Sequence, residues 1–338
     1  MNITKPVVDT LTWAASSDKQ IDLPNEGLIT EIELELYLTA SGALASAGSV
    51  ASLWRAIQSL KIEGGGGKVY FGMSGVQMGI MLHYLNLLDH PGTTWREIVA
   101  TSQYLNFRLH FGSRPRDIFG RRNPFDLTCA IPAFKETNLK LTWGTTANSA
   151  LDASVTISSA TMRATVHEVL PTPEAIAAWS KKIPVSSSEA YDPGATKSDY
   201  SGQRDVPVGN HIRRIVIMCL DATAYSSAGP LLKADQMTEV GVLLNKENRW
   251  IFKSREQAIR LQNPKFDGMQ VAATPNVDSP FDVQGLYNID LRRYDNPDYG
   301  LDARRMTPGD VKLGMTIGAY GAAETEHIWY DQVQDFQL

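Results

Sequence analysis

The chain has 338 residues, of which 43% are hydrophobic and 20% charged, a composition typical of a folded globular protein and not of a disordered one. Its formal net charge of −5 argues against a surface devoted to phosphates, so we expect no specific nucleic-acid site. Its two cysteines, Cys129 and Cys219, are too few for a disulfide framework and are expected to be buried thiols.

Residues 1–6 have neither the apolar run nor the cleavage site of a secretory signal peptide. No stretch of the sequence approaches the roughly 18 apolar residues that a transmembrane helix needs. We therefore expect the protein to be synthesised in soluble form, in the cytoplasm of the cell that produces it.

Alternation of apolar and polar residues predicts the first strands. Thr10–Trp13 is the first, and a polar turn follows it. In the next strand, Ile32–Leu38, the apolar side chains alternate with Glu31, Glu33 and Glu35. We expect this strand to be half-buried. Its glutamates then lie on a solvated face or at a subunit contact rather than forming a catalytic pair.

A hairpin is predicted over residues 60–71, after a stretch of Ala, Ser and Gly at residues 40–52 that we expect to be a surface loop. The hairpin turn is Gly64–Gly67. A phosphate-binding loop would place such glycines before a helix, whereas here the strand Lys68–Phe71 follows them. We therefore expect a flexible turn and no bound nucleotide.

Helical periodicity begins only after this hairpin. Apolar residues over Met78–Leu88 share one helix face, and His90–Gly92 ends the helix. A second helix opens at Thr94, with Glu97 in capping-box spacing. Between the two halves of the chain, a linker helix is predicted over Thr172–Lys182, with proline in the first position that helices favour.

Seven further strands are predicted from the same period of two. They are Leu105–Phe111, Phe125–Ile131, Leu139–Trp143, Met162–Val169, Tyr287–Leu291, Val311–Ile317 and His327–Val333.

Two segments far apart in the sequence share one pattern. Pro24–Leu34 and Pro207–Ile217 each have isoleucine or leucine at matching positions after the proline, at an offset of 207 − 24 = 183 residues. A second hairpin over residues 240–252 ends at Phe252, and 252 − 71 = 181. A helix over Ser254–Gln262 follows it, as a helix follows the first hairpin. The shared order predicts two similar domains in tandem.

The repeated strand differs between the halves in one respect. In the second half Ile215, Ile217 and Cys219 form one face, and Val216 and Met218 make the other face apolar too. A strand that is apolar on both sides is expected to be covered by something extra, such as the sister domain or a neighbouring chain.

Many short alternating strands without a regular strand–helix alternation indicate an all-β protein. We expect two tandem jelly-roll β-sandwich domains with short helical inserts and a linker helix. The first domain is expected over residues 1–171, the linker over 172–202 and the second domain over 203–338.

No catalytic or metal site is evident in the sequence. No Gly-x-Ser-x-Gly motif occurs, and no two histidines have the spacing of metal ligands. The six histidines are His83, His90, His110, His167, His211 and His327. His110 and His167 lie on polar strand faces, where we expect them to be solvated. We expect no catalytic residue, no metal and no cofactor.

Arginines gather in three predicted loops. They are Arg114, Arg116, Arg121 and Arg122, then Arg292 and Arg293, then Arg304 and Arg305. Solvated loops are the simplest interpretation, and salt-bridged contacts with neighbouring subunits are the main alternative.

Tandem helix-bearing sandwiches without a catalytic constellation resemble the double jelly-roll major capsid proteins of tailless icosahedral viruses, the adenovirus-type capsid lineage. The resemblance covers nearly the whole chain. It rests on the paired segments at Pro24 and Pro207, the paired hairpins ending at Phe71 and Phe252, and the helix Thr172–Lys182.

This resemblance implies a structural protein of the virion and not an enzyme. It implies homotrimers that form pseudo-hexagonal capsomers, contacts with neighbouring capsomers, and contacts with minor capsid or membrane proteins. It also implies synthesis in the host cytoplasm and assembly into an icosahedral shell.

The alternative is a carbohydrate-active or carbohydrate-binding protein made of two β-sandwiches, because tryptophans often stack on sugars. Against it, Trp54, Trp143, Trp179 and Trp250 lie in patterns where packing in the core is their ordinary role.

Overall fold

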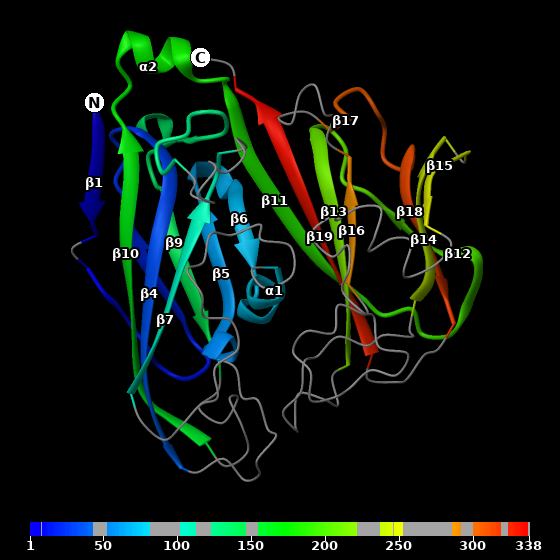
Figure 1. Cartoon of the computed structure of the whole chain (residues 1–338), viewed down its shortest axis with the longest axis horizontal. Coiled ribbons are helices and arrows are strands. Elements are labelled where there is room, and N and C mark those ends of the chain that lie inside the picture. The colour runs from blue at the N-terminus through cyan, green and yellow to red at the C-terminus, as the bar shows by residue number, and fades with distance from the viewer. Residues whose placement is uncertain are drawn as a thin grey trace. The chain divides into compact units, whose positions relative to one another are not determined.

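The computed structural model describes residues 1–7, 9–42, 53–81, 102–112, 123–146, 155–221, 237–245, 247–252, 286–291, 300–318 and 324–336. The chain forms two compact units (Figure 1). One comprises Met1–Ser187 with Val333–Leu338, and the other comprises Ser188–Gln332.

The first unit contains two antiparallel sheets. One has the order β1 (Asn2–Pro6), β10 (Val155–Val169), β4 (Leu28–Gly42) and β7 (Ser102–His110), with β2 (Leu11–Thr12) on β10 and β8 (Ile131–Pro132) on β4. The other has the order β3 (Asp18–Asp22), β9 (Lys140–Thr145), β5 (Ile57–Glu63) and β6 (Val69–Met73). Figure 1 shows β10, β4 and β7 side by side in one layer.

The second unit is also built on two sheets. One has the order β11 (Lys182–Tyr191), β19 (Glu324–Asp335), β13 (His211–Asp221) and β16 (Leu286–Asp290), with β17 (Leu301–Asp302) on β13. The other has the order β12 (Lys197–Asp205), β18 (Val311–Ile317), β14 (Met237–Leu244) and β15 (Glu247–Phe252).

The two units share one strand order. When the eight main strands of each are counted along the chain, one sheet has the order 1-8-3-6 and the other 2-7-4-5 in both units. The prediction that the two halves have the same fold is confirmed at the level of strand order.

Register supports the same equivalence. Leu28 at the start of β4 pairs with Pro132 of β8, and His211 at the start of β13 pairs with Asp302 of β17. Leu28 and His211 therefore occupy equivalent positions, and their separation, 211 − 28 = 183, equals the offset between Pro24 and Pro207.

The hairpin offset needs a correction of two residues. Ile62 of β5 pairs with Phe71 of β6. The pairing of β5 and that of β14 are irregular at matching positions, which makes Val242 the equivalent of Ile62. Val242 pairs with Trp250 of β15. Phe71 therefore corresponds to Trp250 and not to Phe252. A shift of two keeps the side chains on the same face of the sheet, so the apolar pattern could not reveal it.

Both cores follow from the alternation in the sequence. In β4, Ile32, Leu34 and Leu36 are buried, whereas Glu35 is exposed. In the second unit, one apolar cluster draws residues from both sheets, and the Tyr287 hydroxyl of β16 donates to the Met237 carbonyl of β14 at 2.5 Å. Each unit is thus a sandwich with its own core.

Val216 and Met218 of β13 are both completely buried within the chain. The expectation that something covers the second face of this strand is therefore met in the monomer.

The segment Phe125–Ile131 differs from its prediction. Only Ile131–Pro132 is a strand, β8, and turns precede it. The Asn123 Oδ1 accepts from the Phe125 amide at 3.0 Å, and the Asp126 Oδ1 accepts from the Thr128 amide at 3.0 Å. These side-chain bonds offer the backbone an alternative to strand pairing.

The predicted linker also differs. It begins with α2 (Pro173–Ala178), as expected, but β11 (Lys182–Tyr191) and most of β12 (Lys197–Asp205) lie where residues up to 202 were expected to be irregular. The first strand of the chain, β1, was also not predicted. The predicted helices after residue 81 and over Ser254–Gln262 lie outside the described residues, as does most of the 40–52 stretch.

The helical insert α1 (Gly75–Ile80) begins with a complete capping box. The Ser74 hydroxyl accepts from the Gln77 amide at 3.2 Å, and the Gln77 side chain accepts from the Ser74 amide at 2.9 Å. Met78 and Met81 then enter the core. The described residues also include the short helical turns η1 (Leu53–Ala56), η2 (Gly65–Gly67) and η4 (Ala133–Lys135).

Ser74→Ala is expected to lower the free energy of unfolding by about 1 kcal/mol, because the Gln77 amide loses its acceptor at a helix start. Urea unfolding of the purified chain measures the change. Ser159→Ala, at an exposed position of β10, is the control and is expected to stay within about 0.5 kcal/mol of the wild type. Equal effects of the two substitutions would contradict the capping role.

Candidate functional site

A row of polar side chains crosses the first sheet of the first unit. Thr4 of β1 pairs with His167 of β10, His167 pairs with Glu31 of β4, and Glu31 pairs with His110 of β7. Residues paired across antiparallel strands lie on the same face and close together. Four strands thus bring these four side chains into one line.

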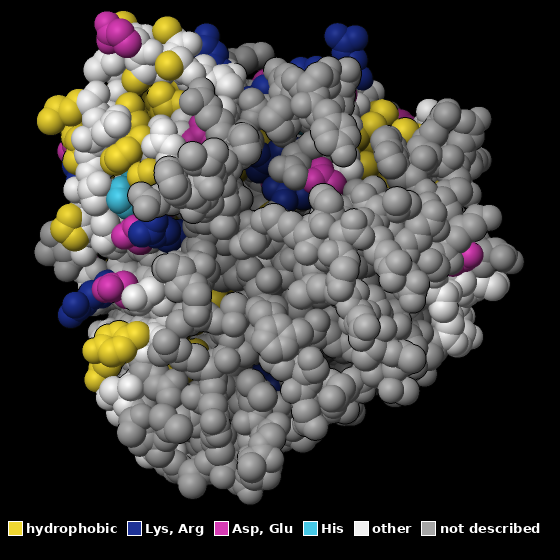
Figure 2. Space-filling view, in the orientation of Figure 1, with side chains coloured by type: hydrophobic (Ala, Val, Ile, Leu, Met, Phe, Trp, Pro, Cys, Tyr) yellow, Lys and Arg dark blue, Asp and Glu magenta, His cyan; other side chains and the backbone are white. Residues whose placement is uncertain are grey.

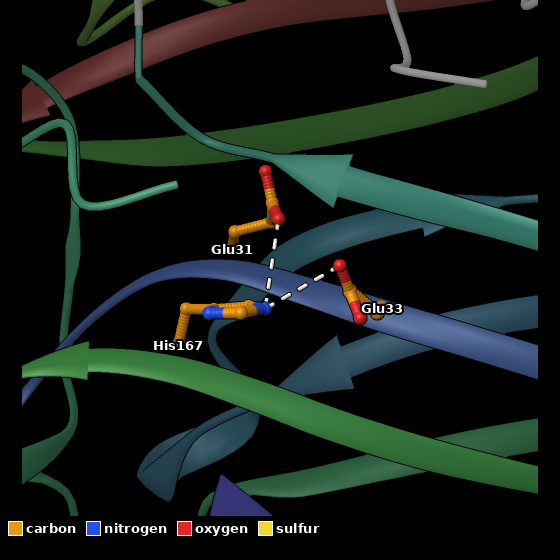
Figure 3. Close-up of side chains that lie close together, drawn as sticks. All are labelled: Glu31, Glu33 and His167. Atoms are coloured by element: carbon orange, nitrogen blue, oxygen red, sulfur yellow. Dashed lines mark ion pairs between the residues drawn. The ribbon is translucent and has the colours of Figure 1, made fainter. Parts of the chain in front are cut away.

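The contacts within the row centre on Glu31. His110 Nδ1 lies 3.2 Å from Glu31 Oε2, and His167 Nε2 lies 3.7 Å from Glu31 Oε1. Glu33, two residues further along β4, places its Oε1 3.5 Å from the same His167 Nε2. Figure 3 shows this ring nitrogen directed at both carboxylates.

Thr4, at one end of the line, and Arg108, beside it, hold these groups. The Thr4 Oγ1 is 3.0 Å from His167 Nδ1, so the imidazole is fixed at the nitrogen that faces away from the carboxylates. The Arg108 guanidinium of β7 lies 2.7 Å from Glu33 Oε1. Arg108 is the direct cross-strand partner of Glu33, which explains this contact.

The row is buried, which corrects an expectation. The side chains of Glu31 and His110 are each 1% exposed and that of His167 is 11% exposed, whereas Glu33 is 32% exposed. The Phe125 ring packs edge-on against the His167 ring at 5.6 Å. The predictions that His110 and His167 are solvated and that Glu31 lies on a solvated face are therefore wrong.

Several atoms of this row lack hydrogen-bond partners. Among the described residues, Glu31 Oε1, His167 Nε2 and His110 Nε2 are buried without one. Burying a carboxylate oxygen and imidazole nitrogens without partners is costly. An arrangement of this kind marks a candidate site for binding a ligand.

Sequence reasoning missed this cluster because its members are far apart in the chain. Glu31 and His167 are separated by 136 residues (167 − 31), and no local motif joins them. The sequence offered one signal, the position of Glu31 and Glu33 on the same face of one strand. Finding the site would also have required a correct prediction of which strands lie beside that one in the sheet.

The glycine run Gly64–Gly67 joins β5 and β6 as the expected hairpin turn. Gly66 and Gly67 have φ of 71° and 77°, which other residues rarely adopt. The Gly65 amide donates to Glu136 Oε2 at 2.6 Å, and the Tyr70 hydroxyl donates to Glu136 Oε1. Burial, and next the Glu136 carboxylate, raises the pKa of the Tyr70 hydroxyl above its ordinary range.

The second unit holds a buried group of charges. The carboxylate of Asp331 on β19 accepts from Arg213 Nη2 at 2.6 Å and Nε at 3.1 Å, and from Arg214 Nε at 3.2 Å. Arg213 and Asp331 are 7% and 4% exposed. This network ties β13 to β19, and its role is structural.

The remaining sequence candidates do not gather into a site. His211 is buried 3.9 Å from Asp302, and burial lowers the pKa of His327. Arg304 forms an exposed pair with Asp302. The other predicted arginine loops, with His83 and His90, lie outside the described residues. Both cysteines are buried thiols, as predicted, and burial raises the pKa of Cys219.

The described surface shows charges of both signs. Figure 2 shows Lys and Arg side chains interspersed with Asp and Glu on the visible face. Within the described part of the chain, no helix has the length and apolar character that crossing a membrane requires.

Neither a protein-family model nor a curated protein matches the sequence. Solved structures match it over its whole length. The crystal structure of the STIV MCP has a TM-score of 0.72 at 16% identity, covering 99% of this chain and 97% of that chain. The atomic structure of Sulfolobus Turreted Icosahedral Virus gives 0.69 at 16% identity, covering 99% and 91%. The major capsid protein P2 from bacteriophage PM2 gives 0.55 at 14% identity, covering 99% and 98%.

Likeness over whole chains, together with the shared strand order, decides the architecture. The fold is a double jelly roll. The predicted class, an all-β chain of two tandem jelly-roll sandwiches with a short helical insert and a linker helix, is confirmed. The similar proteins are viral major capsid proteins.

Proposed function

We propose that this chain is a structural major capsid protein that trimerises into pseudo-hexagonal capsomers and assembles an icosahedral viral shell. The observation that carries the proposal is the double jelly roll itself, matched over 99% of this chain and 97% of the STIV protein.

The proposed role is in the virion and is not enzymatic. The similar solved structures are components of capsids, and one of them is described as part of an icosahedral virus. The proposed partners are two further copies of this chain, neighbouring capsomers, and minor capsid or membrane proteins of the virion. Synthesis in the host cytoplasm belongs to the same proposal.

The division of the chain into compact units differs from the domain limits expected from the sequence. The compact units meet at Ser187 and Ser188, and the C-terminal residues from Val333 group with the first unit. We propose two jelly rolls with the helix α2 between them, the second beginning near β11 rather than at residue 203.

A carbohydrate-binding role has lost its main support. Trp54, Trp143 and Trp179 are 1%, 0% and 3% exposed, so these three rings are not available for stacking on a sugar. The side chain of Trp250 lies outside the described set.

The purified chain is expected to be a trimer at micromolar concentration. Light scattering coupled to size exclusion should give a mass of 3 × 37.2 kDa, or about 112 kDa. The mass is measured at low and at high salt concentration, because salt would weaken an association that is only electrostatic. A mass near 37 kDa that persists across salt and protein concentration would argue against a capsomer.

Electron microscopy of the same fractions tests the second half of the proposal. Particles with a hexagonal outline, or closed shells, are expected for a pseudo-hexagonal capsomer. A compact trimer with a triangular outline that never associates further would support trimerisation and contradict shell assembly.

A further inference from the structure

We propose that Glu31, Glu33 and His167 bind a divalent transition-metal ion of the zinc type between β4 and β10 of the first jelly roll. One ligand atom from each of these residues lies within 4.8 Å of the others. The proposal is independent of the proposed capsid role.

The donor set favours zinc over the harder cations. Two carboxylate oxygens and one imidazole nitrogen are ligands that Zn²⁺ accepts, with a water completing four-coordination. Calcium and magnesium prefer sites made of oxygen alone, and Ca²⁺ takes six to eight ligands. One imidazole among three protein donors therefore selects the transition metals.

The distances between the donors fit a shared ion better than hydrogen bonds. His167 Nε2 lies 3.5 Å from Glu33 Oε1 and 3.7 Å from Glu31 Oε1, beyond the usual hydrogen-bond range of about 2.7–3.2 Å. Two ligands held about 2.0–2.2 Å from a tetrahedral zinc ion are about 3.3–3.6 Å apart. The two separations from His167 are close to that value, and the two carboxylate oxygens lie within 4.8 Å of each other.

Neighbouring residues already orient the ligands. Thr4 Oγ1 lies 3.0 Å from His167 Nδ1, and in the tautomer in which Nδ1–H donates to this hydroxyl the Nε2 lone pair is directed at the carboxylates. His110 Nδ1, 3.2 Å from Glu31 Oε2, leaves Oε1 of the same carboxylate directed at His167. Metal ligands in proteins are commonly held by such second contacts, which fix their orientation.

Burial supplies the second, independent observation. Glu31 Oε1 and His167 Nε2 are buried and have no hydrogen-bond partner among the described residues, and both are directed into the proposed site. A cation would satisfy both atoms and balance two adjacent carboxylates, of which Arg108 contacts only Glu33. Glu33, about one-third exposed, provides a path for the ion from solvent.

The experiment uses the full chain, purified in the presence of a chelator and then dialysed free of it. Titration calorimetry with Zn²⁺ is expected to give one ion per chain at this site, and Zn²⁺ is expected to raise the unfolding temperature. Equal concentrations of Ca²⁺ and Mg²⁺ are expected to have little effect. Co²⁺ serves as a coloured substitute that reports imidazole and carboxylate coordination by its visible absorption.

Three variants separate metal binding from folding. His167→Gln removes the nitrogen ligand and is expected to weaken Zn²⁺ affinity at least ten-fold and to abolish the Co²⁺ absorption. Glu33→Gln, at a partly exposed position, is expected to weaken binding without disturbing the fold. Glu35→Gln, two residues further along β4 on the same face and exposed, is the matched control and is expected to bind like the wild type.

His110→Gln tests the positioning contact. Loss of a residue that orients a ligand commonly lowers metal affinity by about 10–100-fold, and stoichiometry should remain one. Absence of Zn²⁺ binding in the wild-type chain, or equal binding by wild type, His167→Gln and Glu33→Gln, would overturn the proposal. The contacts would then be ion pairs between histidine and glutamate. The mass of the same samples in light scattering reports on the capsomer separately.

Discussion

Asp331→Ala is expected to destabilise the second jelly roll by about 3–5 kcal/mol, the usual cost of removing one partner from a buried ion pair. Among the bonds that the Asp331 carboxylate accepts are those from Nε and Nη2 of Arg213 and from Nε of Arg214. Without it, two guanidinium groups that are largely buried lose their shared anion. The loss exceeds that of an ordinary hydrogen bond because burial leaves little water to replace the carboxylate.

Amide hydrogen exchange in β13 and β19 measures this loss, because these strands carry the three residues. Asp302→Ala is the matched control. Asp302 also pairs with an arginine, Arg304 at 2.7 Å, but both side chains are about half exposed, so a loss of at most about 1 kcal/mol is expected. Equal losses for the two variants would show that burial does not govern the strength of the Asp331 network.

The repeat at an offset of 183 residues was the most informative feature of the sequence. It held because a buried strand in the middle of a sheet tolerates few changes in spacing: Ile32 and Ile215, equivalent at that offset, are both completely buried. Alternation along β7, β10, β18 and β19 was equally predictive, since each of these strands has one face on a core.

Edges of the fold were harder to predict. β1 has a regular alternation of exposed and partly buried positions but no apolar face, so its sequence does not distinguish it from a polar tail. β11 and β12 are rich in serine and charged residues, which in isolation favour an irregular segment. Pairing with β10, β19 and β18 determines these strands, and the pairing is set by tertiary structure rather than local sequence.

The buried polar row shows why the site was missed. Alternation correctly placed Glu31 on the face of β4 opposite Ile32, but it could not show that this face is covered there. The Phe125 ring against His167 belongs to the segment predicted wrongly as a strand. The wrong strand prediction for that segment is therefore linked to the wrong prediction that His167 is solvated.

The two jelly rolls have diverged at equivalent positions on this face. Glu31 is paired with His110 in the first, and at the same offset of 214 − 31 = 183 Arg214 is paired with Asp290 in the second. Both jelly rolls keep a polar cross-strand pair in this place, with the carboxylate on β4 in the first and on β16 in the second. Among the described residues, the cluster of Glu31, Glu33 and His167 is therefore found in the first jelly roll and not in the second.

Glu326→Gln is expected to make the protein more stable than the wild type at pH 8 and equally stable near pH 5. Glu326 on β19 is completely buried, and neither carboxylate oxygen has a hydrogen-bond partner within the described residues. Burial, and secondly the nearby Asp192 carboxylate, raises the pKa of Glu326 from 4.5 to about 8. A neutral side chain is therefore the form that the folded state favours.

The sign of the pH dependence follows from proton binding. Between pH 4.5 and 8 the folded state keeps a proton that the unfolded state has released, so stability is fully present below this window and falls as pH rises through it. The loss approaches about 1.4 kcal/mol per pH unit, or roughly 3–4 kcal/mol between pH 5 and pH 8. Glutamine carries no charge at any pH and avoids this loss.

The measurement is the free energy of urea unfolding for both proteins at pH 5 and pH 8. Taking the difference between variant and wild type at each pH cancels the other titrating groups, which the two proteins share. Glu35→Gln, at an exposed position, is expected to show the same difference at both pH values. A Glu326→Gln difference that does not grow with pH would mean that Glu326 is ionised in the folded protein. A partner would then stabilise the charged carboxylate, and burial would not keep the side chain protonated.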